Sequence, residues 1–185
     1  MAKIVSVFGG AKPRPETPPY EEARRLGALL AQSGWAVATG GYSGVMEATS
    51  RGAAEAGGHV IGVTCEAIEQ WRGLRANAWV KDEIKFPTLR QRLYHLVDFC
   101  DATVALPGGI GTLSEIALTW SLLQTGEIRP KPLIVVGRLW SETVSTFIRE
   151  AEEYLHPGNA ELIRVVNGVD DVVGQISDIR LQIAD

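Results

Sequence analysis

A glycine-rich turn and a carboxylate stand close together in the stretch ALPGGIGTLSEI, residues 105–116. Three glycines and a proline leave the backbone bare before a run with helical periodicity, and Glu115 follows one turn into that run. Bare backbone N–H groups at the start of a helix can cradle a phosphate, and a nearby carboxylate can act as an acid or base. The same residues also fit a tight turn followed by a capping box, in which Thr112 is the N-cap and Glu115 returns to its backbone N–H.

Glycine pairs follow three apolar runs of the chain, at Gly9-Gly10, Gly40-Gly41 and Gly108-Gly109. The carboxyl ends of parallel strands share one edge of a sheet, and ligands bind there. A single strand-to-helix turn can use glycine for tightness alone. Three such turns at one edge favour a binding site for an anionic, phosphorylated ligand.

The elements that must position these turns alternate along the chain. Short runs rich in Val, Ile and Ala predict strands at 3–9, 35–40, 59–64, 102–108, 132–137 and 163–167, with a further one at 79–84. Amphipathic stretches predict helices at 17–33, 43–57, 88–99, 111–125, 140–154 and 169–182. Residues 65–79 fit a functional loop or a short surface helix. This alternation predicts one α/β domain over residues 1–185, with a doubly wound, mostly parallel sheet and helices on both faces.

Charge and composition limit the partners. The formal net charge is −4, whereas a dedicated nucleic-acid binder usually has a basic domain or stripe, so we expect no nucleic acid. No apolar run approaches the ~20 residues of a membrane span, and the chain starts without a signal-peptide pattern, so we expect a cytoplasmic protein and no membrane. Cys65 and Cys100 lie far apart, which favours buried free thiols and no metal site.

A dinucleotide site is poorly supported. GGIGTLS approximates the GxGxxG/A pattern, but that pattern belongs on the first strand–helix unit with an acidic residue ending the next strand. Here the next strand runs into LIVVGRLW, which contains no carboxylate, and the P-loop pattern is absent.

Several motifs resemble those of the LONELY GUY family of cytokinin-activating nucleoside 5′-monophosphate phosphoribohydrolases. LPGGIGTLSE (106–115) fits the family's PGGxGTxxE motif, and GGYSGVMEATSRGAAEAGGHVIGVT (40–64) resembles its GGxxGxM…GGxVIGV block. The likeness covers roughly residues 3–137. The family's arginine helix matches LRQRL (89–93), where Arg92 stands nine residues before Asp101. Taken alone, Arg92 would also fit an arginine whose stem packs on the sheet while its charged head reaches solvent.

The resemblance implies a Rossmann-like homodimer that hydrolyses the N-glycosidic bond of a purine nucleoside 5′-monophosphate, such as AMP or an N6-modified AMP, without a metal or organic cofactor. Arg92 and Glu115 would be catalytic, and the carboxylate and guanidinium suit an oxocarbenium-like sugar and a charged phosphate or leaving base. The role of each remains open at this point. Substrate and phosphate contacts are expected from Gly10, Gly40, Gly41, Gly44, Pro107, Gly108, Gly109, Gly111 and Thr112.

Two other functions use related folds. A non-catalytic carrier of a phosphorylated ligand, such as molybdenum cofactor, is the main alternative. A DNA-binding relative of DNA-processing protein A fits poorly with the acidic balance of the chain.

The helical run after the third glycine turn predicts how the chain self-associates. Leu113, Ile116, Ala117, Trp120 and Leu123 form one apolar stripe that we expect to face the sheet. Glu115, Leu118 and Leu122 would then lie off that stripe. We expect a second subunit to cover Leu118 and Leu122, which places two sites near a two-fold interface.

Overall fold

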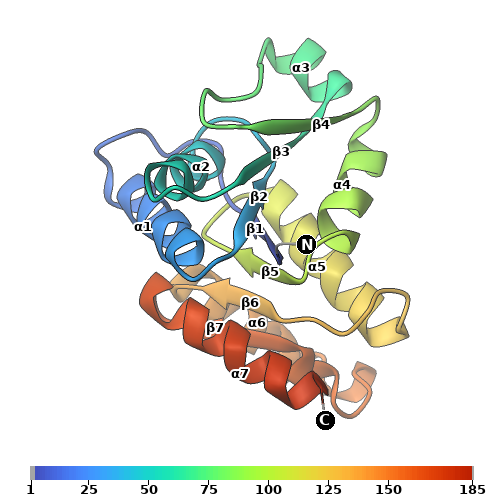
Figure 1. Cartoon of the computed structure of the whole chain (residues 1–185). Helices are drawn as coiled ribbons and strands as arrows, with labels where there is room; N and C mark the ends of the chain where they lie inside the picture. Colours follow the sequence, from blue (N-terminus) through green and yellow to red (C-terminus); the bar gives the residue numbers. More distant parts are fainter. Residues whose placement is uncertain (1–2, 185) are drawn as a thin grey trace.

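The strands of the protein are short apolar runs that pair into one parallel sheet. The computed structural model describes residues 3–184, in which seven strands follow the order β4-β3-β2-β1-β5-β6-β7 (Figure 1). All neighbouring pairs are parallel. The strands are β1 (Ile4–Phe8), β2 (Ala36–Thr39), β3 (Val60–Cys65), β4 (Asp82–Phe86), β5 (Ala102–Ala105), β6 (Leu133–Val136) and β7 (Ile163–Val166). The predicted doubly wound α/β fold is therefore confirmed.

β4 is the strand that the sequence predicted least well, at 79–84 instead of Asp82–Phe86. It lies at one edge of the sheet and pairs only with β3. Its charged, exposed residues Asp82, Glu83 and Lys85 suit an edge, because charge there opposes pairing with another chain. An edge strand of this kind lacks the continuous apolar run by which the inner strands are found.

Helices cover both faces of the sheet, as predicted. α1, α2 and α7 pack on one face, and α4, α5 and α6 on the other. Residues 65–79 contain a short surface helix, α3, which was one of the two expectations for this segment. The helices are α1 (Pro18–Gln32), α2 (Val45–Glu55), α3 (Glu66–Arg72), α4 (Leu89–Asp98), α5 (Ile110–Thr125), α6 (Arg138–Glu150) and α7 (Val172–Ala184), with short 3-10 turns η1 (Glu152–Tyr154), η2 (Asn159–Leu162) and η3 (Val169–Asp171).

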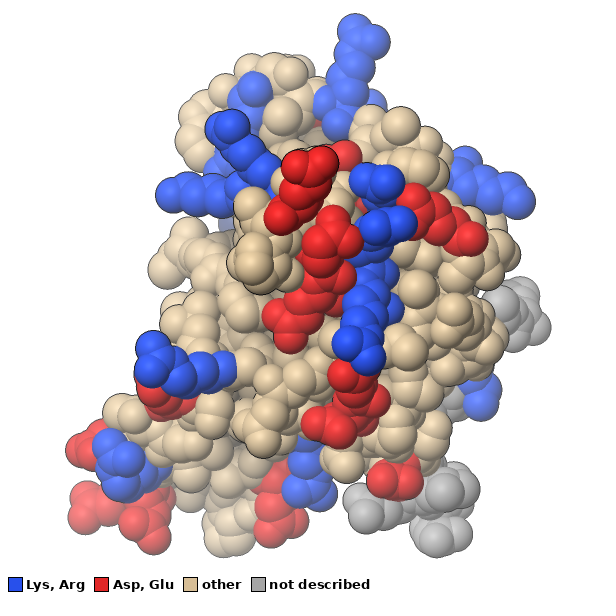
Figure 2. Space-filling model, turned by 90° about the vertical axis from the view of Figure 1, so that its left-hand side faces the viewer, with Lys and Arg blue, Asp and Glu red and all other residues tan. Residues whose placement is uncertain are grey.

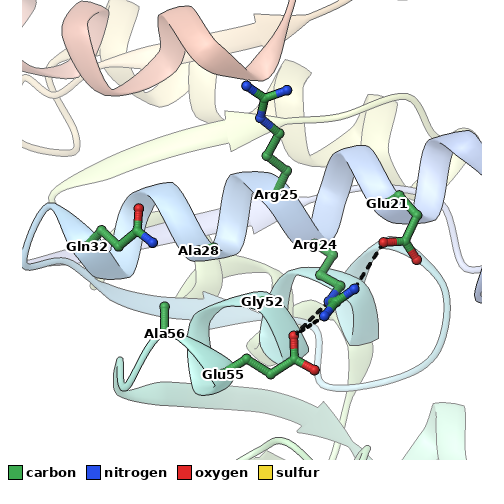
Figure 3. Close-up of a pocket in the computed structure, with 8 residues that line it drawn as sticks. All are labelled: Glu21, Arg24, Arg25, Ala28, Gln32, Gly52, Glu55 and Ala56. Atoms are coloured by element: carbon green, nitrogen blue, oxygen red, sulfur yellow. Dashed lines mark hydrogen bonds and ion pairs between the residues drawn. The ribbon is translucent and has the colours of Figure 1, made fainter.

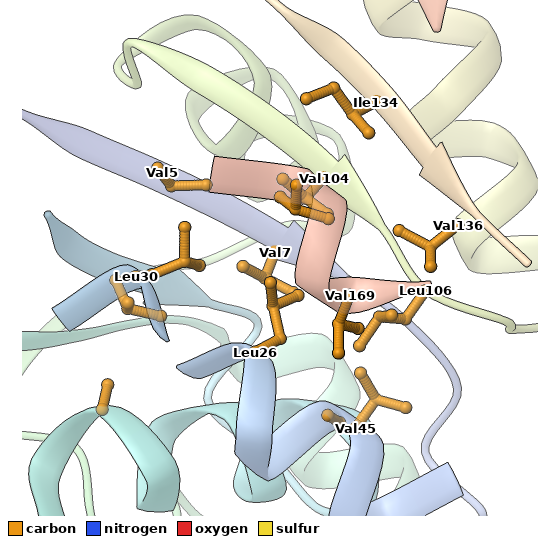
Figure 4. Packing of buried hydrophobic residues seen from close by; sticks show 14 of the residues in the cluster. Val5, Val7, Leu26, Leu30, Val45, Val104, Leu106, Ile134, Val136 and Val169 are labelled. Carbon is orange, nitrogen blue, oxygen red and sulfur yellow. The ribbon is translucent and has the colours of Figure 1, made fainter. Parts of the chain in front are cut away.

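The core lies between the sheet and the helices on each face. Val5 and Val7 of β1 point toward α1, where Leu26 and Leu30 meet them (Figure 4). Phe8, at the end of the same strand, belongs to the cluster on the opposite face. This alternation explains why the inner strands read as continuous apolar runs, since both of their faces are covered.

The order of the strands creates a switch point between β1 and β5. The chain builds β1 to β4 outward in one direction and then returns to place β5 on the other side of β1. Phe8 of β1 pairs with Ala105 of β5, so the turns that follow these strands are adjacent. In open parallel sheets the carboxyl edge at such a point is where ligands bind.

A buried lysine holds the C-terminal end of α4 near the amino ends of the strands, opposite the carboxyl edge. Lys131 is only 4% exposed, and its ammonium donates hydrogen bonds to the carbonyl oxygens of Val97, Asp98 and Cys100 at 2.8–2.9 Å. A cation suits the partial negative charge at a helix C-terminus. Burial lowers the pKa of Lys131 below its ordinary value. This contact fixes the helix that carries Arg92.

The outer side of α1 and α2 carries interleaved charges. Figure 2 shows this side of the molecule, with basic and acidic side chains next to one another rather than segregated. Arg24 pairs with Glu55 at 2.6 Å, and Arg25 pairs with Asp170 at 2.7 Å.

Both cysteines are buried free thiols, as predicted. Within residues 3–184, no helix combines the length and apolarity needed to cross a membrane.

Candidate active site

α5 begins three residues earlier than a capping box at Thr112 would require. The helix starts at Ile110 with Gly109 as its N-cap, and no side chain caps it. The capping-box interpretation of Thr112 and Glu115 is therefore wrong, because both residues already lie inside the helix. Gly109, Ile110 and Gly111 are exposed, and the first backbone N–H groups of a helix have no partner within it. The N-terminus of α5 is thus open to an anion.

The face of α5 that packs toward the sheet differs from the predicted stripe. Leu113 and Ala117, which were expected to face the sheet, are exposed. Thr119 Oγ1 donates to the carbonyl oxygen of Glu115 at 2.7 Å, which satisfies this hydroxyl inside the protein. The buried residues are Thr112, Glu115, Ile116, Thr119 and Leu122. Polar residues fill the inner face at the end nearest the glycine turns, so apolar periodicity alone pointed to the wrong side.

Arg92 and Glu115 lie close together beside the glycine turns. α4 starts after Thr88, whose hydroxyl caps the helix by accepting the N–H of Gln91 at 3.3 Å. Arg92 is only 5% exposed, and its Nε donates to the carbonyl oxygen of Val63 at 2.8 Å. Its Nη1 lies 3.9 Å from Oε1 of Glu115. The alternative in which the head of Arg92 reaches solvent is therefore wrong.

Burial decides the protonation of Glu115. Removal from water raises the pKa of this carboxyl to about 7, and the nearby Arg92 guanidinium lowers it only in part. A carboxyl with this pKa exchanges its proton near neutral pH, as acid–base catalysis requires.

This pKa predicts how stability depends on pH. Between about pH 4.5 and 7 the folded protein holds a proton on Glu115 that the unfolded chain has lost, so the free energy of unfolding falls as pH rises through this window. Glu115→Gln has no such proton. We expect its stability relative to the wild type to be higher at pH 8 than at pH 5, by up to roughly 3 kcal/mol. Urea denaturation at the two pH values measures this difference, and an equal difference at both would contradict the raised pKa.

The second glycine turn packs against both Arg92 and the first turn. A side chain at Gly40 would collide with the Arg92 guanidinium, so glycine is required for the arginine to lie there. Gly44 has φ +74° and lies against the carbonyl oxygen of Gly10. That oxygen accepts the N–H of Val45, the first residue of α2, at 2.9 Å. The turns after β1 and β2 therefore form one unit.

The third turn joins the first directly. The N–H of Gly10 donates to the carbonyl oxygen of Pro107 at 3.1 Å. A side chain at Gly108 would collide with the hydroxyl of Thr112. The residues predicted to bind substrate thus lie in three neighbouring turns and the start of α5, at the carboxyl edge of the sheet: Gly10, Gly40, Gly41, Gly44, Pro107, Gly108, Gly109, Gly111 and Thr112.

Two surface pockets lie outside this cluster. One, of about 320 Å³, lies between α1 and α2 (Figure 3). Its Arg24 is held by Glu55 and Glu21, so this guanidinium is not free for a ligand. The other is lined by Thr88, Arg90 and Gln91 at the start of α4. Neither includes Arg92 or Glu115.

Tyr42 is a site residue that the sequence did not reveal. It follows the second glycine pair, is buried, and places its ring 5.8 Å from the Arg92 guanidinium carbon. A single tyrosine in a glycine turn carries no pattern by which it could have been found. His95, one turn beyond Arg92 on α4, stacks on Phe99 and packs against Phe86, so it belongs to an aromatic cluster.

A doubly wound parallel sheet with three glycine turns at its switch point defines a Rossmann-like protein. More narrowly, the chain belongs to the SLOG cluster4 family, whose model matches residues 2–156.

Relatives and solved structures cover nearly the whole chain. A cytokinin riboside 5′-monophosphate phosphoribohydrolase from Rhodococcoides fascians is 30% identical in an alignment that covers 96% of this chain and 89% of that protein. A protein of the same name from Mycobacterium tuberculosis is 32% identical over 178 residues, covering 91% of this chain and 90% of that one. The molybdenum cofactor binding protein from Rippkaea orientalis has a similar structure, with a TM-score of 0.75, 26% identity, and coverage of 97% and 98%.

Proposed function

We propose that the protein hydrolyses the N-glycosidic bond of a purine nucleoside 5′-monophosphate and releases the free base and ribose 5-phosphate. The observation that carries this proposal is the buried Arg92–Glu115 pair beside three glycine turns. The names of the relatives from Rhodococcoides fascians and Mycobacterium tuberculosis support the same reaction class. Water is the only co-reactant that the reaction needs, because it supplies the hydroxyl for C1′ and the proton for the base.

The two charged groups suit different parts of this reaction. As the bond breaks, positive charge develops on the ribose and negative charge on the departing base. The ionised Glu115 carboxylate would stabilise the sugar cation or orient the attacking water. Arg92 would neutralise the charge on the base, because its Nε is already held by Val63 and its buried head is poorly placed for an exposed phosphate.

The phosphate would bind at the start of α5. Gly109 and Gly111 are exposed there, and added Cβ atoms would meet nothing within 4 Å, so the backbone is accessible. This 16-residue helix directs its partial positive charge at that point. The phosphate would then lie apart from the Arg92–Glu115 pair and leave that pair for the sugar and the base.

A carrier of a phosphorylated ligand is the second candidate. The structural likeness to the molybdenum cofactor binding protein from Rippkaea orientalis favours it, since the same fold serves binding in that protein. A carrier needs the glycine turns but has no need for a carboxyl poised near neutral pH.

Release of the free base from a nucleoside monophosphate distinguishes the enzyme from the carrier. We expect free base to form from AMP or N6-substituted AMP and scarcely at all from the corresponding nucleosides, because only the monophosphates can engage the start of α5. Chromatography of the reaction mixtures measures the base. Tight binding of these monophosphates without release of base would favour the carrier.

We also propose a homodimer, through a different surface from the one first expected. Leu122 belongs to the core and cannot contact a partner. Exposed apolar residues at the starts of α4 and α5, namely Leu89, Ile110 and Leu113, are better candidates for the contact with a partner. Light scattering should give twice the chain mass of 20.0 kDa. Leu89→Glu with Leu113→Glu should yield monomers, whereas Leu139→Glu, an exposed leucine of α6, should not. A monomeric wild type would contradict this proposal.

A further inference from the structure

The Arg92 guanidinium is held by groups from four parts of the chain. Its Nε is tied to Val63 of β3, and its Nη1 faces Glu115 of α5. The backbone of Gly40 lies against Nη2. The ring of Tyr42 covers it at 5.8 Å from the guanidinium carbon, which is within the range of a cation–π contact.

Tyr42 is itself fixed by its hydroxyl. The O–H donates to the carbonyl oxygen of Cys65 at 3.1 Å and accepts the N–H of the same residue at 2.8 Å. Tyr42 is only 3% exposed. Because both hydrogen-bonding roles of the hydroxyl are used, the ring is held to the end of β3. Val63, two residues earlier on this strand, accepts the hydrogen bond of Arg92.

The backbone that carries Tyr42 is fixed from another direction. Asn77 Nδ2 donates to the carbonyl oxygens of both Gly41 and Tyr42 at 3.0 Å. The N–H of Gly41 in turn donates to Thr39 Oγ1 at 3.0 Å. The second glycine turn is therefore fixed at both its backbone and its one large side chain.

We propose that Tyr42 is a positioning residue, which holds the Arg92 guanidinium beside Glu115. The importance of this placement for catalysis rests on the proposed function, but the placement itself does not. A side chain that only fills space would not need a hydroxyl that both donates to and accepts from the backbone of Cys65. Holding an arginine at a set distance from a carboxyl, by contrast, requires a fixed ring. Without the ring, the guanidinium would gain room to move from its place beside Glu115.

The carboxyl of Glu115 reports the position of Arg92 in the absence of any substrate. Its pKa can be followed by carbon NMR in protein labelled at the glutamate carboxyl carbon, with Glu115→Gln assigning the signal. In Tyr42→Leu the guanidinium should move away, and the pKa of Glu115 should rise above its wild-type value by roughly half a unit to one unit. Tyr42→Phe keeps the ring but loses both hydrogen bonds to Cys65, and should give a smaller rise. Tyr20→Phe, a change at a buried tyrosine of α1, is the matched control and should give none.

An unchanged pKa of Glu115 in folded Tyr42→Leu would overturn the proposal. If that variant fails to fold, Tyr42→Phe carries the test, and an unchanged pKa there would overturn it equally. Kinetics with AMP add a second readout: kcat should fall at least tenfold in Tyr42→Leu with KM changed less, and recover in part in Tyr42→Phe. If the protein proves not to hydrolyse AMP, the proposed function fails while the NMR result still decides the role of Tyr42.

Discussion

Glu115→Gln should lower hydrolysis of the nucleoside monophosphate by about 10²–10⁴-fold, the range over which a positioned acid–base group acts. Glutamine has nearly the same shape but can neither ionise nor exchange a proton near pH 7. The fold should survive, because Glu115 is buried and burial disfavours its charged form. The melting temperature at pH 8 should therefore equal or exceed that of the wild type. Steady-state kinetics and thermal unfolding of the same preparation measure both effects.

The matched control for this change is Glu127→Gln. Glu127 lies just beyond the C-terminus of α5 and is exposed, so its replacement should leave activity and stability unchanged. If Glu115→Gln keeps most of the activity, the carboxyl has only a structural role.

Arg92→Gln should cause a loss of similar size for a different reason. The buried guanidinium is the positive charge next to Glu115, so its removal takes away stabilisation of the departing base and raises the pKa of Glu115 further. Stability should also fall, because the carbonyl oxygen of Val63 loses its donor. The fall should be greater at pH 8 than at pH 6, since at lower pH Glu115 can take up a proton and avoid an unpaired buried charge.

Arg90→Gln is the control for the arginine. Arg90 lies on the same helix two residues earlier, is exposed, and should tolerate the change. Kinetics with AMP and urea denaturation at both pH values distinguish the two variants. Equal activity of Arg92→Gln and Arg90→Gln would remove Arg92 from the proposed chemistry.

Most of the fold could be predicted because the inner strands are covered on both faces. A strand such as β6, Leu133–Val136, is wholly apolar for that reason, and glycine turns mark where several strands end. The edge strand β4 was displaced by about two to three residues, because its exposed positions carry charges. The three glycine turns were correctly expected at the carboxyl edge of the sheet, since the carboxyl ends of parallel strands all lie on that edge.

The face of α5 could not be predicted from apolar periodicity. Thr112, Glu115 and Thr119 are polar yet buried, because the end of the sheet that they approach carries the candidate site. Polar residues on an inner face break the apolar periodicity by which the buried side of a helix is recognised. The departure from the expected pattern is therefore itself a sign of function.

Tyr42 and Asn77 escaped prediction for a related reason. Their hydrogen bonds join turns that are distant in sequence, to Cys65 in one case and to Gly41 in the other. No periodicity or short spacing records such contacts. Arg92 was found only through the family resemblance, which places an arginine nine residues before Asp101, and the structure adds that it is buried rather than solvated.

The most direct test of the proposed reaction is to incubate the protein with AMP and quantify adenine and ribose 5-phosphate together, with Glu115→Gln in parallel. We expect equal amounts of the two products from the wild type and almost none from the variant. Binding of AMP without either product, or the same product yield from Glu115→Gln, would contradict it.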